Sequence, residues 1–279
     1  MSDKGFLYVC ATPIGNLGDI SERLRSTLGM VDVVYAEDTR RTGKLLSHIG
    51  ITVPMRSMFS GNESERTDEM LGRLEAGEKV ALVSDAGMPS VSDPGADAVR
   101  LARTAGIAVT VIPGPSAVTT AVALSGFAGD RFVFEGFLPR KGAERQRRIR
   151  SFVDEERPIV LFVSPHRLVA DLEALEKVLG STRQVVVARE LTKLHEEVWT
   201  GTLDEAIAHW GDTAGRGEFS VVIGPGEKRL DDIGVSVAKA RALMESGESA
   251  SAAAREAARA SGHPRREIYE ELLRSQERS

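Results

Sequence analysis

The sequence predicts an α/β protein with two α/β domains and a short helical segment at its C-terminus. Its 279 residues exceed the average domain length of about 150 residues, which favours two domains. Apolar, strand-like runs alternate with helical patterns through the first 125 residues, and a second such pattern follows a break at residues 126–130. After residue 226 the chain becomes rich in alanine, arginine and glutamate. We therefore expect domains over residues 1–126 and 127–226 and a helical tail over residues 227–279.

In the first domain, runs of apolar and β-branched residues have the length of strands, and segments with helical periodicity separate them. The expected strands are Phe6–Ala11, Val31–Ala36, Lys79–Val83 and Ile107–Ile112, and the expected helices are Ser21–Leu28, Thr39–Ile49, Glu63–Glu75 and Gly95–Ala105. Such continuous apolar strands, alternating with helices, predict a parallel sheet covered on both faces. Two helix starts carry capping signals, namely Asp19 followed by Glu22, and Asp93 before Pro94.

The second domain has a mixed pattern of strands and helices. Its expected strands are Arg131–Glu135, Pro158–Val163, Gln184–Ala188, Glu197–Thr200 and Phe219–Ile223, and its expected helices are Ala143–Asp154, Leu168–Leu179 and Leu203–His209. In the tail, we expect helices over Val237–Glu245, Ala250–Ala260 and Arg265–Arg274. Their helix–turn–helix-like spacing fits a small RNA-contacting module and a helical cap on the second domain equally well.

The composition excludes several classes of protein. Hydrophobic residues make up 42% and charged residues 28% of the chain, which is typical of globular proteins. No apolar run approaches the roughly 20 residues of a membrane helix, and the first residues lack the apolar core of a signal peptide. The single cysteine, Cys10, excludes a disulfide framework, and the five scattered histidines show no metal-ligand spacing. We therefore expect a protein of the reducing cytoplasm, without a membrane segment or a metal site.

Four loops at the predicted strand ends have an unusual composition. They are rich in glycine, proline and polar residues, and they cover residues 11–19, 37–41, 84–95 and 113–117. Because ligands of open α/β sheets bind beyond the carboxyl ends of the strands, these loops predict a preorganised small-molecule site. Asp85 is placed to accept hydrogen bonds from a ligand, and Ile14 and Met88 are placed to cover an apolar ring. Asp85 has a simpler alternative role as a turn or capping carboxylate.

Several common motifs are absent. The chain has no Gly-x-Gly-x-x-Gly, and Gly43-Lys44 lacks the other residues of a phosphate-binding P-loop. His195 has no second histidine at helical spacing, and neither Ser116 nor Ser164 lies in a Gly-x-Ser-x-Gly elbow. These absences argue against a Rossmann dinucleotide site, a zinc protease and a serine hydrolase.

The charge of the chain is unevenly distributed. The net charge of −5 argues against nonspecific binding of nucleic acid over the whole surface. Residues 140–150, however, contain six basic side chains and one acidic side chain. This segment is either a phosphate-contacting patch or a solvated helix face, and the charge alone leaves both interpretations open.

The loop motifs carry a resemblance to a known family. Leu7–Asp19, Ala36–Arg40, Ser84–Pro89, Ser92–Gly95 and Pro113–Ala117 resemble the ribosomal RNA small subunit methyltransferase I family, and Glu135–Gly142, Ser164–Arg167 and Ala188–Glu197 fit it in the same order. Together these motifs follow one another in the correct order between about residues 6 and 225. Met88 stands where the resemblance would place a small polar residue, usually threonine. This family is part of the tetrapyrrole-methylase-like, class III methyltransferases.

The resemblance implies two α/β domains with S-adenosyl-L-methionine in the cleft between them, and commonly a homodimer. It implies 2′-O-methylation of the ribose of a decoding-centre cytidine in 16S rRNA, position 1402 in the usual rRNA numbering, with the 30S subunit as the expected partner. The cofactor contacts that it implies are Pro13, Ile14, Gly15, Asp85, Gly87, Met88, Ser116 and Ala117, with Ser164, Arg189 and Glu190 from the second domain.

Transfer to a ribose hydroxyl requires removal of a proton, which a carboxylate can accept. Glu37 and Asp38 leave a strand end facing the expected cleft, so either of them is a candidate for proton acceptance or substrate orientation. Their alternative role is to form salt bridges with Arg40 and Arg41. Lys193, from the opposite domain, is a candidate for stabilising a phosphate or orienting a carboxylate.

Two other functions stay open at this point. A class III methyltransferase acting on a small tetrapyrrole-like substrate would have the same fold and cofactor, but it would not need the basic segment or the helical tail. A non-catalytic RNA-binding protein would leave the four preorganised loops unexplained.

Overall fold

The computed structural model describes residues 4–127, 130–211, 215–226, 233–261 and 263–277. One compact unit holds both sheets, and the helical tail forms most of a second unit. Residue 227, where we expect the tail to begin, lies outside the described residues. The division of the chain at residues 126 and 226 stays a prediction.

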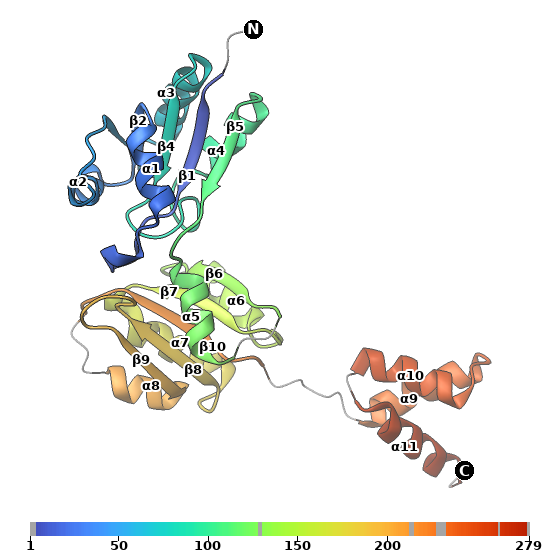
Figure 1. Cartoon of the computed structure of the whole chain (residues 1–279). Helices are drawn as coiled ribbons and strands as arrows, with labels where there is room; N and C mark the ends of the chain where they lie inside the picture. Colours follow the sequence, from blue (N-terminus) through green and yellow to red (C-terminus); the bar gives the residue numbers. More distant parts are fainter. Residues whose placement is uncertain (1–3, 128–129, 212–214, 227–232, 262, 278–279) are drawn as a thin grey trace. The chain divides into compact units, whose positions relative to one another are not determined.

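The first part of the chain folds into a parallel five-stranded sheet, as the sequence predicts (Figure 1). The strands are β1 (Phe6–Cys10), β2 (Val33–Ala36), β3 (Met55–Ser57), β4 (Lys79–Val83) and β5 (Ala108–Ile112), in the order β3-β2-β4-β1-β5. Helices α1 (Glu22–Met30) and α2 (Thr39–His48) pack on one face, and α3 (Glu63–Glu75) and α4 (Ala96–Thr104) pack on the other. Strand β3 was not predicted from the sequence, because its three residues are only partly buried and have a charged residue at their centre.

Both predicted helix caps are wrong. The N-cap of α1 is Ser21, whose hydroxyl accepts a hydrogen bond from the Leu24 N–H at 3.1 Å, whereas Asp19 lies in the preceding 3₁₀ helix η1 (Leu17–Asp19). Helix α4 begins after Gly95, which has a φ of 123°. The Gly95 N–H donates to the carboxylate of Glu63 at 2.8 Å, so this amide is bound by a residue distant in sequence and not by Asp93.

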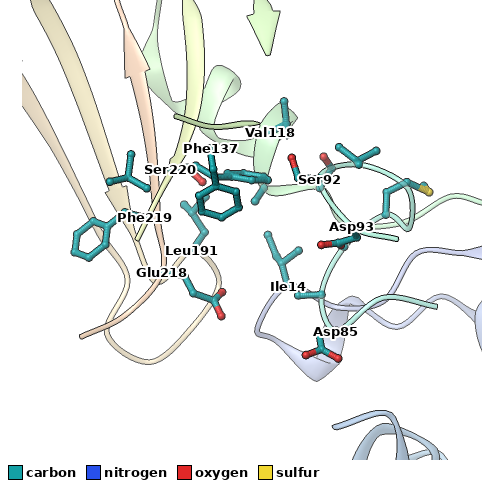
Figure 2. Close-up of a pocket in the computed structure, with 18 of the residues that line it drawn as sticks. Ile14, Asp85, Ser92, Asp93, Val118, Phe137, Leu191, Glu218, Phe219 and Ser220 are labelled. Carbon is teal, nitrogen blue, oxygen red and sulfur yellow. The ribbon is translucent and has the colours of Figure 1, made fainter. Parts of the chain in front are cut away.

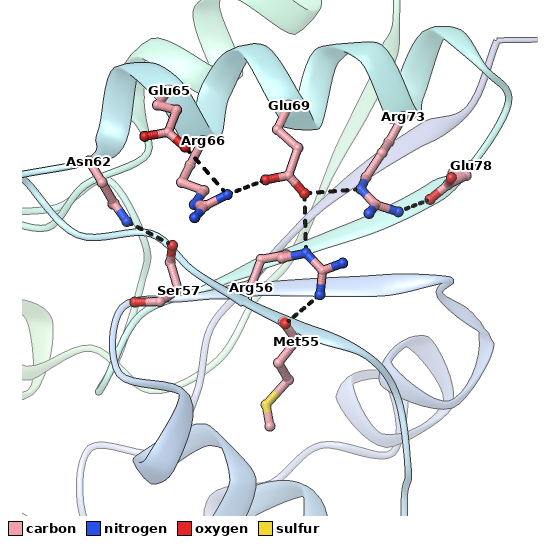
Figure 3. Close-up of polar contacts among 9 residues, drawn as sticks. All are labelled: Met55, Arg56, Ser57, Asn62, Glu65, Arg66, Glu69, Arg73 and Glu78. Carbon is pink, nitrogen blue, oxygen red and sulfur yellow. Dashed lines mark hydrogen bonds and ion pairs between the residues drawn. The ribbon is translucent and has the colours of Figure 1, made fainter.

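A network of charged side chains joins α3 to the edge of the first sheet (Figure 3). The carboxylate of Glu69 accepts hydrogen bonds from Arg56 of β3 at 3.2 Å and from Arg66 and Arg73 of its own helix. Burial opposes ionisation of Glu69, but the hydrogen bonds from Arg66 and Arg73 help to outweigh it, and the pKa of this carboxyl is lowered. The network therefore holds α3 against the edge strand β3.

The second sheet is mixed. Its strands are β6 (Val133–Phe137), β7 (Ile159–Val163), β8 (Gln184–Arg189), β9 (Glu197–Thr202) and β10 (Phe219–Ile223), in the order β6-β7-β10-β8-β9. Strand β10 runs antiparallel to both of its neighbours, β7 and β8. The start of β10 therefore lies at the same sheet edge as the ends of β7 and β8.

Helices cover both faces of the second sheet. Helices α6 (Ala143–Ser151), α7 (Leu168–Leu179) and α8 (Leu203–Trp210) share one hydrophobic core with it. Helix α5 (Ala117–Ser125) packs on the other face, where Val118, Ala121 and Val122 contact apolar residues of β7, β8 and β10. The sequence analysis did not identify α5, because its small apolar residues show no amphipathic period. By packing, α5 belongs to the second sheet although it precedes residue 126.

The tail consists of α9 (Ile233–Glu245), α10 (Ala250–Ser261) and α11 (Arg265–Glu277). These helices share a small core that includes Ala253, Ala254 and Ala257 of α10 and Ile268 and Leu272 of α11. The tail thus has a hydrophobic core of its own. Among the helices that the structure describes in this chain, none has the length and apolar character needed to cross a membrane.

Candidate active site

A cavity of about 430 Å³ lies between the loops of the first sheet and the edge of the second sheet (Figure 2). All four loops singled out in the sequence contribute to it. Their lining residues are Ile14 after β1, Glu37 and Arg41 after β2, Asp85–Met88 and Val91–Asp93 after β4, and Ser116–Val118 after β5. The second sheet contributes Phe137 from β6, Phe162–Pro165 from the end of β7, Leu191 after β8 and Gly217–Ser220 at the start of β10.

Main-chain hydrogen bonds fix the loops after β1 and β4 to each other. The Thr12 N–H donates to the Gly87 carbonyl at 2.9 Å, and the Gly87 N–H donates to the Thr12 carbonyl at 3.1 Å. The Thr12 hydroxyl adds a hydrogen bond to the Ser84 carbonyl at 3.2 Å. Gly87 has a φ of 78°, a conformation that favours glycine. Because its amide is bound to Thr12, Gly87 contributes the shape of the loop rather than a free donor.

Residues with left-handed backbone conformations border the cavity on both sides. Ser90 and Ser92 have φ angles of 69° and 65° in the loop after β4, and Glu190 and Thr192 have φ angles of 52° and 66° in the loop after β8. Such conformations cost energy for residues other than glycine and persist only where the surrounding structure imposes them. Their presence in both loops indicates that the fold holds this site in one defined shape.

Eleven cofactor-binding residues were predicted from the resemblance, and most of them line this cavity or a smaller one beside it. Ile14, Asp85, Gly87, Met88, Ser116, Ala117 and Ser164 line the first cavity, and Pro13 and Gly15 line the second together with Ile14 and Asp85. Arg189 and Glu190 line neither of the two. Of the predicted catalytic residues, Glu37 lines the first cavity, Lys193 lines the second and Asp38 lines neither.

Asp38 has a structural role at the start of α2. Its carboxylate caps the helix by accepting a hydrogen bond from the Arg40 N–H at 2.8 Å, and it pairs with the Arg40 guanidinium at 2.8 Å. These hydrogen bonds lower the pKa of Asp38 to about 2, which makes its carboxylate a weak proton acceptor. The alternative role predicted from the sequence was to form salt bridges with Arg40 and Arg41, and the salt bridge between Asp38 and Arg40 is present.

Asp85 connects two of the loops. Its carboxylate accepts a hydrogen bond from the Asp38 N–H at 2.9 Å and lies 3.5 Å from the guanidinium of Arg41. These contacts join the loop after β4 to the start of α2. Asp85 thus combines a structural role with a position on the cavity wall.

Glu37 and Asp93 are the carboxyls with raised pKa values in the first cavity. Burial, followed by the negative charge of Asp85, raises the pKa of Glu37. Burial, followed by the charge of Glu37, raises the pKa of Asp93 to about 6. Figure 2 shows the Asp93 side chain directed toward the cavity, on the side opposite Glu218. Carboxyls tuned toward neutral pH are suited to accept or donate a proton, and they mark functional sites more often than chance.

Lys193 and Glu190 belong to a network on the second-sheet side. The Lys193 ammonium lies 2.9 Å from the Glu190 carboxylate and 3.1 Å from that of Glu218. Burial favours the neutral amine, but the two carboxylates outweigh it and raise the pKa of Lys193. Glu190 also accepts a hydrogen bond from the Glu218 N–H at 2.8 Å. Arg189 lies outside the cavities, 3.8 Å from Glu197 and over the ring of Phe219.

The opposite part of the first cavity is apolar and aromatic. Ile14, Val118 and Leu191 form part of its wall, and Phe137 lies with its ring centre 5.7 Å from that of Phe162. Phe137 is 55% exposed although it follows a buried residue of β6, so its ring is available to a ligand. Such a surface suits a flat heteroaromatic ring.

The residues of the cavity that were not predicted as site residues include Asp93, Phe137, Phe162 and Glu218. Asp93 was assigned to a helix cap, and Phe137 was quoted only as part of a motif. Glu218 precedes β10 and Ser220 is its second residue. Both lie at the amino end of this strand, whereas the rule used for the sequence places sites at the carboxyl ends of strands. The antiparallel direction of β10 brings them to the cavity.

Two of the six basic side chains in the segment 140–150 form ion pairs with described residues of the second sheet and its helices. Arg145 pairs at 2.7 Å with Asp171 of α7, and Arg148 pairs at 2.8 Å with Glu135 of β6. Both arginines therefore stabilise the second domain. Arg147 and Arg150 are exposed on α6 and, among the described residues, have no ion-pair partner.

Comparisons with known proteins identify the family of this chain. The family Tetrapyrrole (Corrin/Porphyrin) Methylases matches residues 7–207. Ribosomal RNA small subunit methyltransferase I of Synechocystis sp. is 46% identical over 275 residues, which cover 95% of this chain and 96% of that protein. The protein of the same name from Thermotoga maritima is 48% identical over 219 residues, which cover 78% of this chain and 98% of that protein.

Solved structures agree in fold. The methyltransferase CobJ has a TM-score of 0.62 at 20% identity, with 82% of this chain and 97% of that chain covered. The cobalt precorrin-4 methyltransferase CbiF has a TM-score of 0.59 at 19% identity, with 78% and 94% covered. At these identities the likeness concerns the fold alone.

The two sheets, the cavity between them and the matching family define a methyltransferase of the tetrapyrrole-methylase type, which takes its methyl group from S-adenosyl-L-methionine. Within this class, the chain belongs to the ribosomal RNA small subunit methyltransferase I family. The family resemblance read from the loop motifs is thereby confirmed.

The residues of the first cavity fit this methyl donor. S-adenosyl-L-methionine carries positive charges on its sulfur and its amino group, and the described residues that line the cavity include four acidic side chains and one basic side chain, Arg41. Its apolar and aromatic wall suits the adenine ring. A volume of about 430 Å³ falls in the range of ligand sites, roughly 300–1,000 Å³.

Proposed function

We propose that this chain methylates the 2′-hydroxyl of a decoding-centre cytidine of 16S rRNA, position 1402 in the usual rRNA numbering. The family to which the chain belongs supports rRNA as the substrate. We further propose that the enzyme acts in the cytoplasm, as a homodimer, on the assembled 30S subunit. The net negative charge of the chain supports the assembled subunit as the substrate. A negatively charged protein attracts naked RNA only weakly, so the enzyme has to recognise the defined shape of the subunit.

The observation that carries this proposal is the pair of raised-pKa carboxyls, Glu37 and Asp93, in a cavity suited to the methyl donor. S-adenosyl-L-methionine supplies a methyl group that its positively charged sulfur already activates. The protein therefore has two tasks, alignment of the ribose oxygen and removal of its proton. Alignment alone contributes about 7–11 kcal/mol when the geometry is tight.

We assign the proton acceptor to Glu37. Its carboxyl lines the cavity, its pKa is raised, and it has no arginine partner at ion-pair distance among the described residues. Asp38, the other candidate from the sequence, is engaged with Arg40 and has a pKa of about 2. Burial and the negative charge of Asp85 raise the pKa of Glu37 and so keep its carboxylate basic. A positioned base of this kind contributes roughly 10²–10⁴-fold to the rate.

For donor binding, we propose Ile14, Asp85, Met88, Ser116, Ala117 and Ser164 as direct contacts, since all of them line the first cavity. Pro13, Gly15 and Gly87 shape the loops around it. We propose that Lys193, Glu190 and Arg189 maintain the second-sheet side of the site through their ion pairs.

Transfer of a tritium-labelled methyl group tests this function directly. Intact 30S subunits, free 16S rRNA and a tetrapyrrole are compared as acceptors under the same conditions. We expect transfer to 30S subunits, at a cytidine ribose. Transfer to the tetrapyrrole alone would instead establish the alternative small substrate, and transfer to free 16S rRNA at an equal rate would remove the need for an assembled subunit.

A further inference from the structure

A second cavity, of about 330 Å³, adjoins the donor cavity. The two share Ile14, Arg41, Asp85, Ala86 and Glu218 in their walls. The second cavity extends from this shared wall along the loop after β1, to Leu17, and along α2, to Leu45. A molecule in the second cavity therefore lies beside a molecule in the first.

The two cavities differ in charge. Among the described residues, the donor cavity is lined by one cationic side chain, Arg41, and by the acidic side chains of Glu37, Asp85, Asp93 and Glu218. The second cavity has three cationic side chains, Arg41, Lys44 and Lys193, against Asp85 and Glu218. An acidic cavity attracts the positively charged donor and repels phosphate, whereas an excess of cations attracts phosphate. The charge therefore separates a place for the donor from a place for an anionic partner.

Two of these cations are available to a ligand. Lys44 is exposed and, in the part of the chain that the structure describes, forms no ion pair and no side-chain hydrogen bond. The side chain of Arg41 is 60% exposed, and its contact with Asp85 is long, at 3.5 Å. Arg41 and Lys44 are three residues apart on α2 and so lie on one helix face. The ammonium group of Lys193 is bound by the carboxylates of Glu190 and Glu218, so its side chain has a fixed position in the cavity wall.

We propose that the second cavity binds the sugar–phosphate backbone of the RNA next to the methylated ribose, with Arg41 and Lys44 contacting a phosphate. This inference rests on the proposed function. Phosphate contacts position a nucleic acid without reading its sequence. Contacts from α2 place the ribose at the shared wall of the two cavities, beside the donor and Glu37.

The test compares Lys44→Gln with Lys177→Gln in the full-length enzyme. Both changes remove one exposed lysine, but Lys177 lies on α7 and lines neither cavity. The readouts are the KM for 30S subunits, the dependence of subunit binding on salt, and the dissociation constant of S-adenosyl-L-methionine measured by calorimetry. Circular dichroism verifies that each variant is folded.

We expect Lys44→Gln to raise the KM for 30S subunits about tenfold and to reduce the salt slope by about one unit, because one phosphate contact is lost. Donor affinity is expected to stay at the parent value, and Lys177→Gln to match the parent throughout. If Lys44→Gln has the KM and the salt slope of the parent enzyme, the inference is overturned. The proposed function still stands in that case, provided that the parent enzyme transfers methyl groups to 30S subunits. Weaker donor binding with an unchanged salt slope would assign the cavity to the donor's carboxylate and also overturn it. A parent enzyme that transfers no methyl group to RNA would overturn both proposals.

Discussion

Gly15 and Lys193 approach each other so closely that a Cβ atom on residue 15 would lie 2.4 Å from the Lys193 Cγ. The same atom would lie 2.8 Å from the Thr192 Oγ1 and 3.1 Å from the Leu191 carbonyl oxygen. The neighbouring Asn16 N–H donates to the Thr192 hydroxyl at 3.1 Å. The loop after β1 thus rests directly on the loop after β8, and this contact closes one side of the two cavities.

Gly15→Ala is expected to separate these loops and displace Lys193 from Glu190 and Glu218. Since a displacement of about 1 Å near reacting groups costs roughly 10²-fold, we expect kcat/KM for methyl transfer to fall by about that factor. Steady-state kinetics measure the effect. The matched control is Gly72→Ala in α3, where an added Cβ meets no atom within 4 Å. The control is expected to gain stability, by about 1 kcal/mol, and to keep full activity; equal kinetics in both variants would refute the importance of the contact.

Glu37→Gln is expected to lower kcat by about 10²–10⁴-fold at saturating donor, because the amide cannot accept the ribose proton. Asp38→Asn is the neighbouring control. Asparagine still caps α2, and the carboxylate of Asp38 is already engaged with Arg40, so kcat is expected to fall less than tenfold. A larger loss in Asp38→Asn than in Glu37→Gln would reverse the assignment of the base.

Asp93 makes the stability of the protein depend on pH. Its pKa is about 6 in the folded chain, against an ordinary value of 3.8, so the folded state binds more protons than the unfolded state between these pH values. The free energy of unfolding therefore decreases as the pH rises from 3.8 to about 6, and this contribution is constant at higher pH. Asp93→Asn is expected to flatten the slope and to stabilise the protein at pH 7.

Urea unfolding at a series of pH values measures this effect. Asp97→Asn, on the exposed surface of α4, provides the control and is expected to retain the slope of the parent. If Asp93→Asn retains the parent's slope as well, the carboxyl of Asp93 is not desolvated as the structure indicates.

Asp85→Ala is expected to weaken S-adenosyl-L-methionine binding by about tenfold or more, as for the loss of a hydrogen bond to a charged group. The change also leaves the Asp38 N–H without its acceptor, so the melting temperature must be measured alongside the dissociation constant. Asp97→Ala removes an exposed carboxylate from α4 and is expected to change neither quantity. An unchanged dissociation constant in folded Asp85→Ala would remove Asp85 from the donor site.

Asp171→Asn is expected to destabilise the second domain by about 3–5 kcal/mol, because it breaks a buried ion pair while leaving the arginine in place. The Asp171 side chain is 5% exposed and contacts Arg145 at 2.7 Å and Arg167 at 3.0 Å. Arg147→Gln, in the same basic segment but exposed, is expected to change stability by no more than about 0.5 kcal/mol. Similar melting temperatures for the two variants would show that the pair contributes little.

The sequence alone predicts those helices and strands whose pattern of apolar residues lies within the element itself. Helix α3, helix α7 and strand β4 begin and end where the periodicity predicts. The parallel first sheet followed from the alternation of apolar strands with helices. Helix α5 was not predicted because its small, mostly apolar residues show no amphipathic period. Strand β3 was not predicted because it depends on pairing with β2 and on the Glu69 network rather than on its own residues.

The site was predictable only from the side of the first sheet. Glu37, Asp85 and Ser116 follow strands that a single rule places at one edge, and all three line the donor cavity. Glu218 reaches the same cavity because β10 inserts antiparallel between β7 and β8, and strand order is a long-range property that the residues of β10 do not encode locally. In the same way, Asp171 neutralises Arg145 from a different helix, which local charge counting cannot reveal.

The bridge between Thr12 and Gly87 consists of main-chain atoms, so the path of the donor loop does not depend on the side chain at position 88. Met88 lines the cavity one residue beyond this bridge. Variation at position 88 can therefore alter the room available to the donor while the scaffold keeps its form. This separation makes position 88 a natural point for engineering: a smaller residue there would admit synthetic donors that carry groups bulkier than methyl, for site-selective labelling of ribosomes.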